Sequence, residues 1–241
     1  MCVFVSVNMK AKFMADRFEV NTDLIKDFDP VYNVSAYAHP ALPVITNEFP
    51  NNVQLFRWGL IPFWVKDENT ANKLSNNTVN ARAETLGEKA SFRAPFKYRR
   101  CIVPVDGFFE FQEVNKIKYP YFIGLKDKKA FALAGLYDVW ENKFSGIVHN
   151  TFSIITTKAN PLMERIHNRK KRMPVILEPG REKEWLAGEV GPDELNKLLV
   201  PFDEKEMKSH TVERLLTRRD GSNNVPESQL EYKYPEIHGL F

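Results

Sequence analysis

The chain has 241 residues, of which 43% are hydrophobic and 27% are charged, a composition typical of one globular domain. Its formal net charge is only +3, which excludes a strongly basic molecule and confines any nucleic-acid surface to a local patch. The two cysteines, Cys2 and Cys101, could pair, but nothing else in the sequence indicates a secreted disulfide scaffold.

The first expected element is a strand at residues 2–8, where valines alternate with Phe4 and Ser6, so that both faces can be buried. This apolar start is too short for the hydrophobic region of a signal peptide, and no run of residues reaches transmembrane length. We therefore expect a protein of the reducing cytoplasm, associated with the nucleoid and not with a membrane, where a thiol at position 2 can persist.

The rest of the first half contains weaker signals. The spacing of Phe13, Met14 and Phe18 indicates a helix over residues 10–18. Short strands are expected between proline-containing breakers, at residues 34–37, 42–45 and 53–56. Residues 57–100 are expected to be mostly irregular or short helix.

The second half has the stronger strand signals. Apolar runs predict strands at residues 101–105, 108–114, 121–125, 131–137, 151–157 and 174–177, and short helices at 160–166, 182–186 and 193–199. Because the strands follow one another without regular helical crossovers, we predict an α+β fold with a largely antiparallel, curved, barrel-like sheet and peripheral short helices. One domain is expected over residues 2–217, followed by a peripheral C-terminal arm, residues 218–241.

Cys2 has unusual chemistry available to it. Removal of Met1 is favoured because cysteine is small, and the freed residue then carries an α-amine and a thiol on adjacent carbons. The ordinary pKa of such an amine is about 7.7–8.0, so a useful fraction is neutral near pH 7 and can attack an aldehyde. The thiol can then close a thiazolidine ring. The alternative is a buried core cysteine, which is the interpretation we favour for Cys101 in its apolar run.

Two further segments hold candidates for nucleic-acid contacts. Trp64 follows a glycine and a proline, and it is a candidate for stacking on bases, with plain aromatic packing as the alternative. Asn80 and Arg82 point to the same side of an extended segment. An arginine there can hold a phosphate and an asparagine can orient a sugar or carbonyl oxygen, although the segment could also simply begin a helix.

Two titratable residues are candidates for proton transfer. Glu110 stands between Phe109 and Phe111 in an expected strand. In a half-apolar cleft its pKa would rise, which suits a general acid near neutral pH, whereas on the solvent face it would only add solubility. His167 follows a short helix, and the four basic residues 169–172 beside it fit either a phosphate-binding rim or a solvated surface.

Taken together, these segments resemble the SOS-response-associated peptidase (SRAP) family, the proteins that shield abasic sites. The motifs that carry the resemblance occur in family order: Met1-Cys2, Trp58-Gly59-Leu60-Ile61-Pro62, Asn80-Ala81-Arg82-Ala83-Glu84-Thr85, Arg100-Cys101-Ile102 with Asp106-Gly107-Phe108-Phe109-Glu110, and Ile166-His167 with Arg172-Met173-Pro174. The resemblance implies single-stranded DNA with an abasic site as the partner and a thiazolidine crosslink through Cys2. It also implies weak lyase activity and self-removal of Met1.

The resemblance also implies a role for each matching residue. The implied catalytic residues are Cys2 as nucleophile, Asn80 as orienting amide, Glu110 as acid and base, and His167 as active-site histidine. The implied DNA contacts are Arg82, Arg169 or Arg172, and more loosely Pro40, with Trp64 and Phe111 able to stack. The chain departs from the family where Val3-Phe4 replaces the usual Gly-Arg and where Phe111 replaces a frequent Trp. We expect no cofactor, no metal ion and a monomer.

Two other classes of function stay open. A cysteine peptidase or amidohydrolase would use Cys2 as an acyl-transfer nucleophile and share Glu110 and His167, but it would not need Arg82. A non-enzymatic DNA-binding module would bury Cys2.

Overall fold

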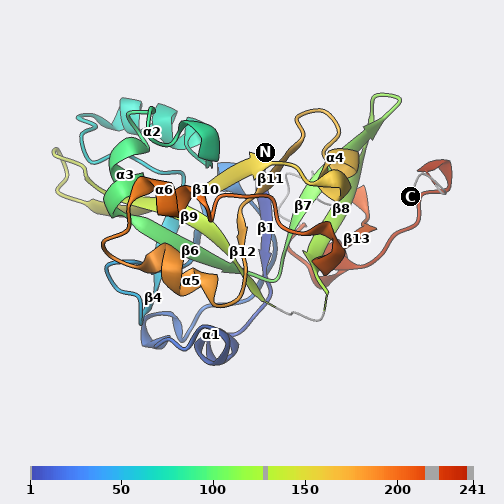
Figure 1. The fold of residues 1–241 in the computed structure, drawn as a ribbon, viewed down its shortest axis with the longest axis horizontal. Coiled ribbons are helices and arrows are strands. Elements are labelled where there is room, and N and C mark those ends of the chain that lie inside the picture. Colours follow the sequence, from blue (N-terminus) through green and yellow to red (C-terminus); the bar gives the residue numbers. More distant parts are fainter. Residues whose placement is uncertain (1, 127–129, 215–222, 238–241) are drawn as a thin grey trace.

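Two β-sheets form the centre of the molecule, and short helices lie around them (Figure 1). The computed structural model describes residues 2–126, 130–214 and 223–237. None of the helices in these three ranges is long and apolar enough to cross a membrane.

The first sheet closes on itself as a five-stranded barrel in the order β10-β4-β3-β6-β9, because β9 pairs with β10 again. Its strands are β3 (Ala41–Thr46), β4 (Val53–Trp58), β6 (Arg100–Val105), β9 (Phe131–Glu141) and β10 (Val148–Lys158). Three short strands extend it: β5 (Asn80–Arg82) and β11 (Arg172–Pro174) on β10, and β12 (Ile176–Leu177) on β9. Only the pairs of β10 with β4 and with β5 are parallel among these named strands.

The second sheet has the strand order β13-β8-β7-β1-β2 and is antiparallel. Its strands are β1 (Phe4–Val7), β2 (Val31–Ser35), β7 (Gly107–Val114), β8 (Ile117–Leu125) and β13 (Met207–Thr211). The predicted α+β class with a largely antiparallel, barrel-like sheet and peripheral helices is therefore confirmed.

The α-helices of the described ranges are short. They are α1 (Ala11–Phe18), α2 (Glu68–Asn77), α3 (Arg93–Tyr98), α4 (Pro161–Ile166), α5 (Arg181–Leu186) and α6 (Pro192–Asn196). In Figure 1, α2 and α3 lie at one end of the molecule and α4 lies beside β7 and β8. The start of α4 is fixed by Asn160, whose side chain accepts a hydrogen bond from the Met163 backbone N–H at 2.8 Å.

Apolar side chains from both sheets form the hydrophobic core. Cys101 is fully buried in it, which confirms the expectation that it is a core residue. The region expected to be irregular, residues 57–100, also contains the short strand β5. This strand pairs with Ile154 to Thr156 of β10, which lie far away in the sequence. Its pairing therefore cannot be predicted from the local sequence pattern. The boundary expected at residue 217 stays a prediction, because residues 215–222 lie outside the described ranges.

Candidate functional site

Cys2 lies two residues before β1, within the main hydrophobic core. Cys2 is 0% exposed, and its carbonyl oxygen accepts a hydrogen bond of 2.8 Å from Asn80 Nδ2. Asn80 comes from β5, on the barrel, so this bond ties the beginning of the second sheet to the first. The other end of the amide, Asn80 Oδ1, is buried and has no hydrogen-bond partner among the described residues. A buried acceptor without a partner is costly unless a ligand or water supplies the donor.

The Cys2 thiol is held in its neutral form. Burial raises the pKa of the Cys2 thiol well above its usual value, and the charge of the Glu110 carboxylate raises it further. Because a thiolate is the stronger nucleophile, this environment does not activate sulfur as the first attacking atom. It favours a reaction in which the sulfur acts second, as its proton leaves.

Glu110 and His167 face each other beside Cys2. Glu110 lies on β7, which pairs with β1, and His167 caps the C-terminal end of α4. Burial raises the pKa of Glu110 to about 7, so both of its protonation states are populated near neutral pH. Burial lowers the pKa of His167 to about 4, so its imidazole is neutral at that pH.

The tautomer of His167 follows from its partner. His167 Nδ1 lies 2.9 Å from the backbone oxygen of Arg172, which can only accept, so Nδ1 carries the proton and donates it there. The distance from Nδ1 to Glu110 Oε1 is 3.6 Å, too long for a strong hydrogen bond. With a neutral ring this contact is not a salt bridge, and Nε2 holds the lone pair that can accept a proton.

A cavity of about 580 Å³ opens above these groups. The residues that line it are Val3, Phe4, Tyr37, Glu110, Phe111, Glu113, Lys118, His167, Arg169 and Lys170. It therefore brings together four of the candidate site residues, Glu110, Phe111, His167 and Arg169, whereas Cys2 is not among its lining residues. Two of the lining residues, Phe4 and Phe111, have ring centroids 5.9 Å apart in an edge-to-face arrangement.

The basic residues expected to contact DNA differ in their surroundings. Arg169 is at the cavity and its side chain is 69% exposed, with Glu113 3.1 Å away. The Arg172 side chain is only 14% exposed. It donates at 2.6 Å both to Glu84 Oε1 and to the backbone oxygen of Thr156. Arg169 is thus accessible to a phosphate, whereas Arg172 is occupied within the protein.

The other candidates lie outside the cavity lining. Arg82 is exposed at the end of β5, two residues from Asn80. Trp64 is 44% exposed in the loop after β4, and Pro40 is partly exposed just before β3. None of the three lines the 580 Å³ cavity, so any contact with the same ligand would be made around its edge.

Sequence reasoning missed Tyr37 and Lys118 in the cavity. The strand expected at residues 121–125 begins earlier, because β8 starts at Ile117, and Lys118 stands directly opposite Glu113 in the β7–β8 hairpin. The turn residues Asn115 and Lys116 both have positive φ, so the reversal takes fewer residues than expected. Tyr37 lies in a 3₁₀ turn at residues 36–38, and its exposure has no signature in the sequence.

The described residues contain no group of three or more His, Cys, Asp and Glu side chains arranged to hold a metal ion.

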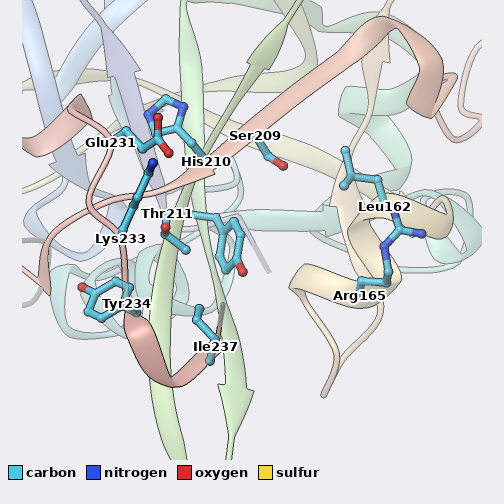
Figure 2. Close-up of a pocket in the computed structure, with 10 residues that line it drawn as sticks. Leu162, Arg165, Ser209, His210, Thr211, Glu231, Lys233, Tyr234 and Ile237 are labelled. Carbon is cyan, nitrogen blue, oxygen red and sulfur yellow. The ribbon is translucent and has the colours of Figure 1, made fainter. Parts of the chain in front are cut away.

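Another cavity, of about 360 Å³, lies between β13, α4 and the C-terminal residues 231–237 (Figure 2).

Comparison with known proteins gives consistent matches. The family model for SOS response associated peptidase (SRAP) matches residues 1–218. The chain is 45% identical over 203 residues to the abasic site processing protein YoqW of Bacillus subtilis, covering 83% of this chain and 86% of that protein. It is 31% identical over 227 residues to the abasic site processing protein HMCES of Xenopus tropicalis, covering 83% and 65%. An X-ray structure of a protein from Bacteroides thetaiotaomicron superposes with a TM-score of 0.91 at 40% identity, covering 96% and 100%.

Proposed function

This chain belongs to the SOS response associated peptidase family, and we propose that it processes abasic sites in DNA by bonding covalently to them through Cys2. The observation that carries the proposal is the grouping of Cys2, Asn80, Glu110 and His167 at one place, with an amide on the Cys2 carbonyl and two titratable groups of opposite pKa shift beside it. The names of the relatives supply the substrate class.

The reaction begins with hydrolysis of the Met1–Cys2 peptide bond, which consumes one water and releases methionine. The neutral Cys2 amine then attacks C1′ of the ring-opened sugar to give a carbinolamine. Glu110, half protonated near pH 7, donates a proton to the departing oxygen, and water leaves. The Cys2 sulfur adds to the resulting iminium carbon, and its proton passes to the Glu110 carboxylate or to His167 Nε2. One aldehyde and one aminothiol thereby give one thiazolidine and one water.

Asn80 and the buried position of Cys2 determine how the reacting groups are held and how the sugar reaches them. Asn80 Nδ2 holds the Cys2 carbonyl, and Asn80 Oδ1 accepts a hydrogen bond from the freed amine or from a sugar hydroxyl. Because Cys2 is fully buried, the cavity above Val3 and Phe4 must admit the sugar down to it. The iminium stage also acidifies the adjacent C2′ proton, so slow β-elimination of the 3′ phosphate, a weak lyase activity, accompanies the crosslink.

A single DNA strand fits the surroundings of the cavity. Arg169, Lys170 and Lys118 supply cations for the flanking phosphates, and the exposed Arg82 extends this set beyond the cavity. The Phe4–Phe111 pair offers apolar surface to an unstacked base, and Trp64 a further stacking face. A contact of Pro40 with the DNA is also part of the proposal.

The two alternatives fit the geometry less well. An acyl-transfer nucleophile works as a thiolate, but burial and Glu110 both raise the pKa of the Cys2 thiol. A binding module without chemistry would bury Cys2, as seen here, but it would not need a carboxyl group with a pKa of about 7 beside a neutral histidine.

Substitutions at position 2 test the proposal. Protein mixed with an abasic single strand is expected to run as a heat-stable adduct on a denaturing gel. Cys2→Ser keeps the amine but loses the sulfur, so its adduct should survive denaturation only after borohydride reduction of the imine. Cys101→Ala, which alters the other buried cysteine, should crosslink at the wild-type level. A stable adduct formed by unreduced Cys2→Ser at the wild-type rate would overturn the proposal.

A further inference from the structure

The C-terminal residues 223–237, called here the clasp, run along both edges of the second sheet. The family match ends at residue 218, so the clasp lies beyond it. The sheet has β2 at one edge and β13 at the other, with β1 next to β2. An edge strand exposes backbone groups that need partners, and the clasp supplies partners at both edges.

At the β2 edge the partners come from two asparagines. Asn224 Oδ1 accepts hydrogen bonds from the backbone N–H groups of Tyr32, at 2.8 Å, and Asn33, at 3.3 Å. The backbone oxygen of Asn223 accepts from Asn33 Nδ2 at 3.4 Å. The edge strand is thus covered where it faces away from β1.

At the β13 edge the clasp continues as a short extended segment. The Tyr232 N–H donates to the Thr211 backbone oxygen at 2.8 Å, and Thr211 Oγ1 donates to the Tyr232 backbone oxygen at 2.6 Å. The hydroxyl of Tyr234 donates to the Val212 backbone oxygen at 2.9 Å. Figure 2 shows Glu231, Lys233 and Tyr234 of the clasp beside His210 and Thr211 of β13.

Gln229 stands between these two attachments and reaches β1. Its Nε2 donates to Ser6 Oγ in the middle of β1 and lies 3.3 Å from Asp106 Oδ2, and its backbone oxygen is 2.8 Å from His210 Nε2. Asp106, at the corner between β6 and β7, also accepts from Ser6 Oγ at 2.6 Å and from the Asn8 N–H at 2.7 Å. The side-chain amide of Gln229 therefore joins β1 to the β6–β7 corner, and its backbone oxygen adds the contact with β13.

This network lies where the pairing of β1 with β2 is irregular, whereas β1 stays paired in regular register with β7 at Phe4, Val5 and Ser6. The register between β1 and β2 shifts between Val5 and Val7, so Ser6 is at an irregular position. At the other end of β1 the anchor is the bond from Asn80 to the Cys2 carbonyl. Only three residues, Val3, Phe4 and Val5, separate Ser6 from Cys2.

We propose that Gln229 is a positioning residue, which acts through Ser6 and Asp106 to hold β1 where the Cys2 amine and sulfur meet the sugar between Glu110 and His167. This inference rests on the proposed function of Cys2. It assigns a role in the same reaction to a segment outside the family match. Misplacement by a fraction of an ångström lowers the rate of a step that depends on orientation, without affecting DNA affinity.

A swap of the two interacting groups tests the proposal. Gln229→Glu places a carboxylate against the Asp106 carboxylate, and Asp106→Asn/Gln229→Glu restores one amide and one carboxylate with their positions exchanged. In single-turnover assays at saturating abasic single-stranded DNA, Gln229→Glu is expected to slow crosslinking about tenfold. The double variant should recover to within about threefold of wild type, and the affinity for an undamaged strand should stay the same in all variants. Glu227→Gln, an exposed change in the same turn, is the matched control.

Three results would overturn the inference. The first is a wild-type crosslinking rate in Gln229→Glu. The second is a folded double variant that crosslinks no faster than Gln229→Glu. The third is a loss of DNA affinity in Gln229→Glu with an unchanged crosslinking rate at saturating DNA. The last result would make the clasp a DNA contact. Hydrogen exchange of the Phe4–Val7 amides separates this inference from the proposed function, because it needs no DNA. It should become about tenfold faster in Gln229→Glu and recover in the double variant, even if wild type formed no adduct.

Discussion

At the scale of single residues, Glu110 and His167 show how one cause gives opposite effects. Burial disfavours the charged form of each, so the pKa of the acid rises to about 7 and the pKa of the base falls to about 4. Near neutral pH the pair therefore consists of a carboxyl group ready to give or take a proton and a neutral imidazole. Both are suited to the proton transfers of imine and ring formation.

The rate of crosslinking should depend on pH as a bell-shaped curve. It rises as the Cys2 amine loses its proton, with an ordinary pKa of about 7.7–8.0. It falls as Glu110 loses the proton that it donates, with a pKa of about 7, which places the maximum between the two values. Single-turnover rates between pH 5.5 and pH 9 measure this. Glu110→Gln should be slower throughout and lack the alkaline decline, so an unchanged decline in that variant would contradict the role of Glu110.

The same pKa shift predicts a pH-dependent stability. A carboxyl group with a raised pKa in the folded state binds a proton more tightly there than in the unfolded chain, so stability falls as pH rises from about 4.5 to about 7. Glu110→Gln removes this loss. It should raise the free energy of unfolding at pH 8 by roughly 1–3 kcal/mol and have little effect at pH 4.5. Denaturant melts at the two pH values check this, and equal effects at both would contradict it.

Substitution of Arg169 should affect DNA binding, whereas substitution of Arg172 should affect the stability of the fold. Arg169→Ala is expected to weaken binding to any single strand and to reduce the salt slope of binding by about one, because it removes one exposed phosphate partner. Arg172→Ala should instead lower the free energy of unfolding by roughly 1–3 kcal/mol, because it leaves Glu84 and the Thr156 carbonyl without their donor. Affinity titrations and thermal melts measure both, and the reverse assignment of effects would contradict this interpretation.

At the scale of elements, the sequence was most informative where the pattern is local. The apolar runs at residues 101–105 and 108–114 predicted β6 and β7. The extended conformation expected at Asn80 and Arg82 is found in β5, but its pairing with β10, more than 70 positions away, has no local signal. The irregular pairing at Ser6 likewise has no local signal, and the partners of its side chain, Asp106 and Gln229, lie far away in the sequence.

The β7–β8 turn allows a test of this local picture. Asn115 and Lys116 have φ of 51° and 66°, the left-handed values that a two-residue hairpin turn requires at both positions. Lys116→Gly should relieve the cost at the second position and raise the free energy of unfolding by roughly 0.5–1 kcal/mol. A thermal melt that shows destabilisation would contradict the assigned turn.

At the scale of the whole molecule, the site forms where the two sheets meet. Cys2 comes from the residues just before β1, Glu110 from the second sheet, Asn80 from a strand on the barrel, and His167 from the connection between β10 and β11. The residue types could be selected from the sequence, because each is unusual in its own segment. Their meeting point, the burial that sets their pKa values and the contribution of Tyr37, Lys118 and Gln229 required the fold.

In the proposed reaction, the bond to DNA forms at both the nitrogen and the sulfur of Cys2. Mass spectrometry of the tryptic N-terminal peptide, residues 2–10, after reaction with an abasic single strand measures it most directly. We predict a peptide that lacks Met1, carries the DNA remnant with the loss of one water, and has no thiol left for alkylation. A remnant on another peptide, or on residues 2–10 with an alkylatable thiol, would contradict the account.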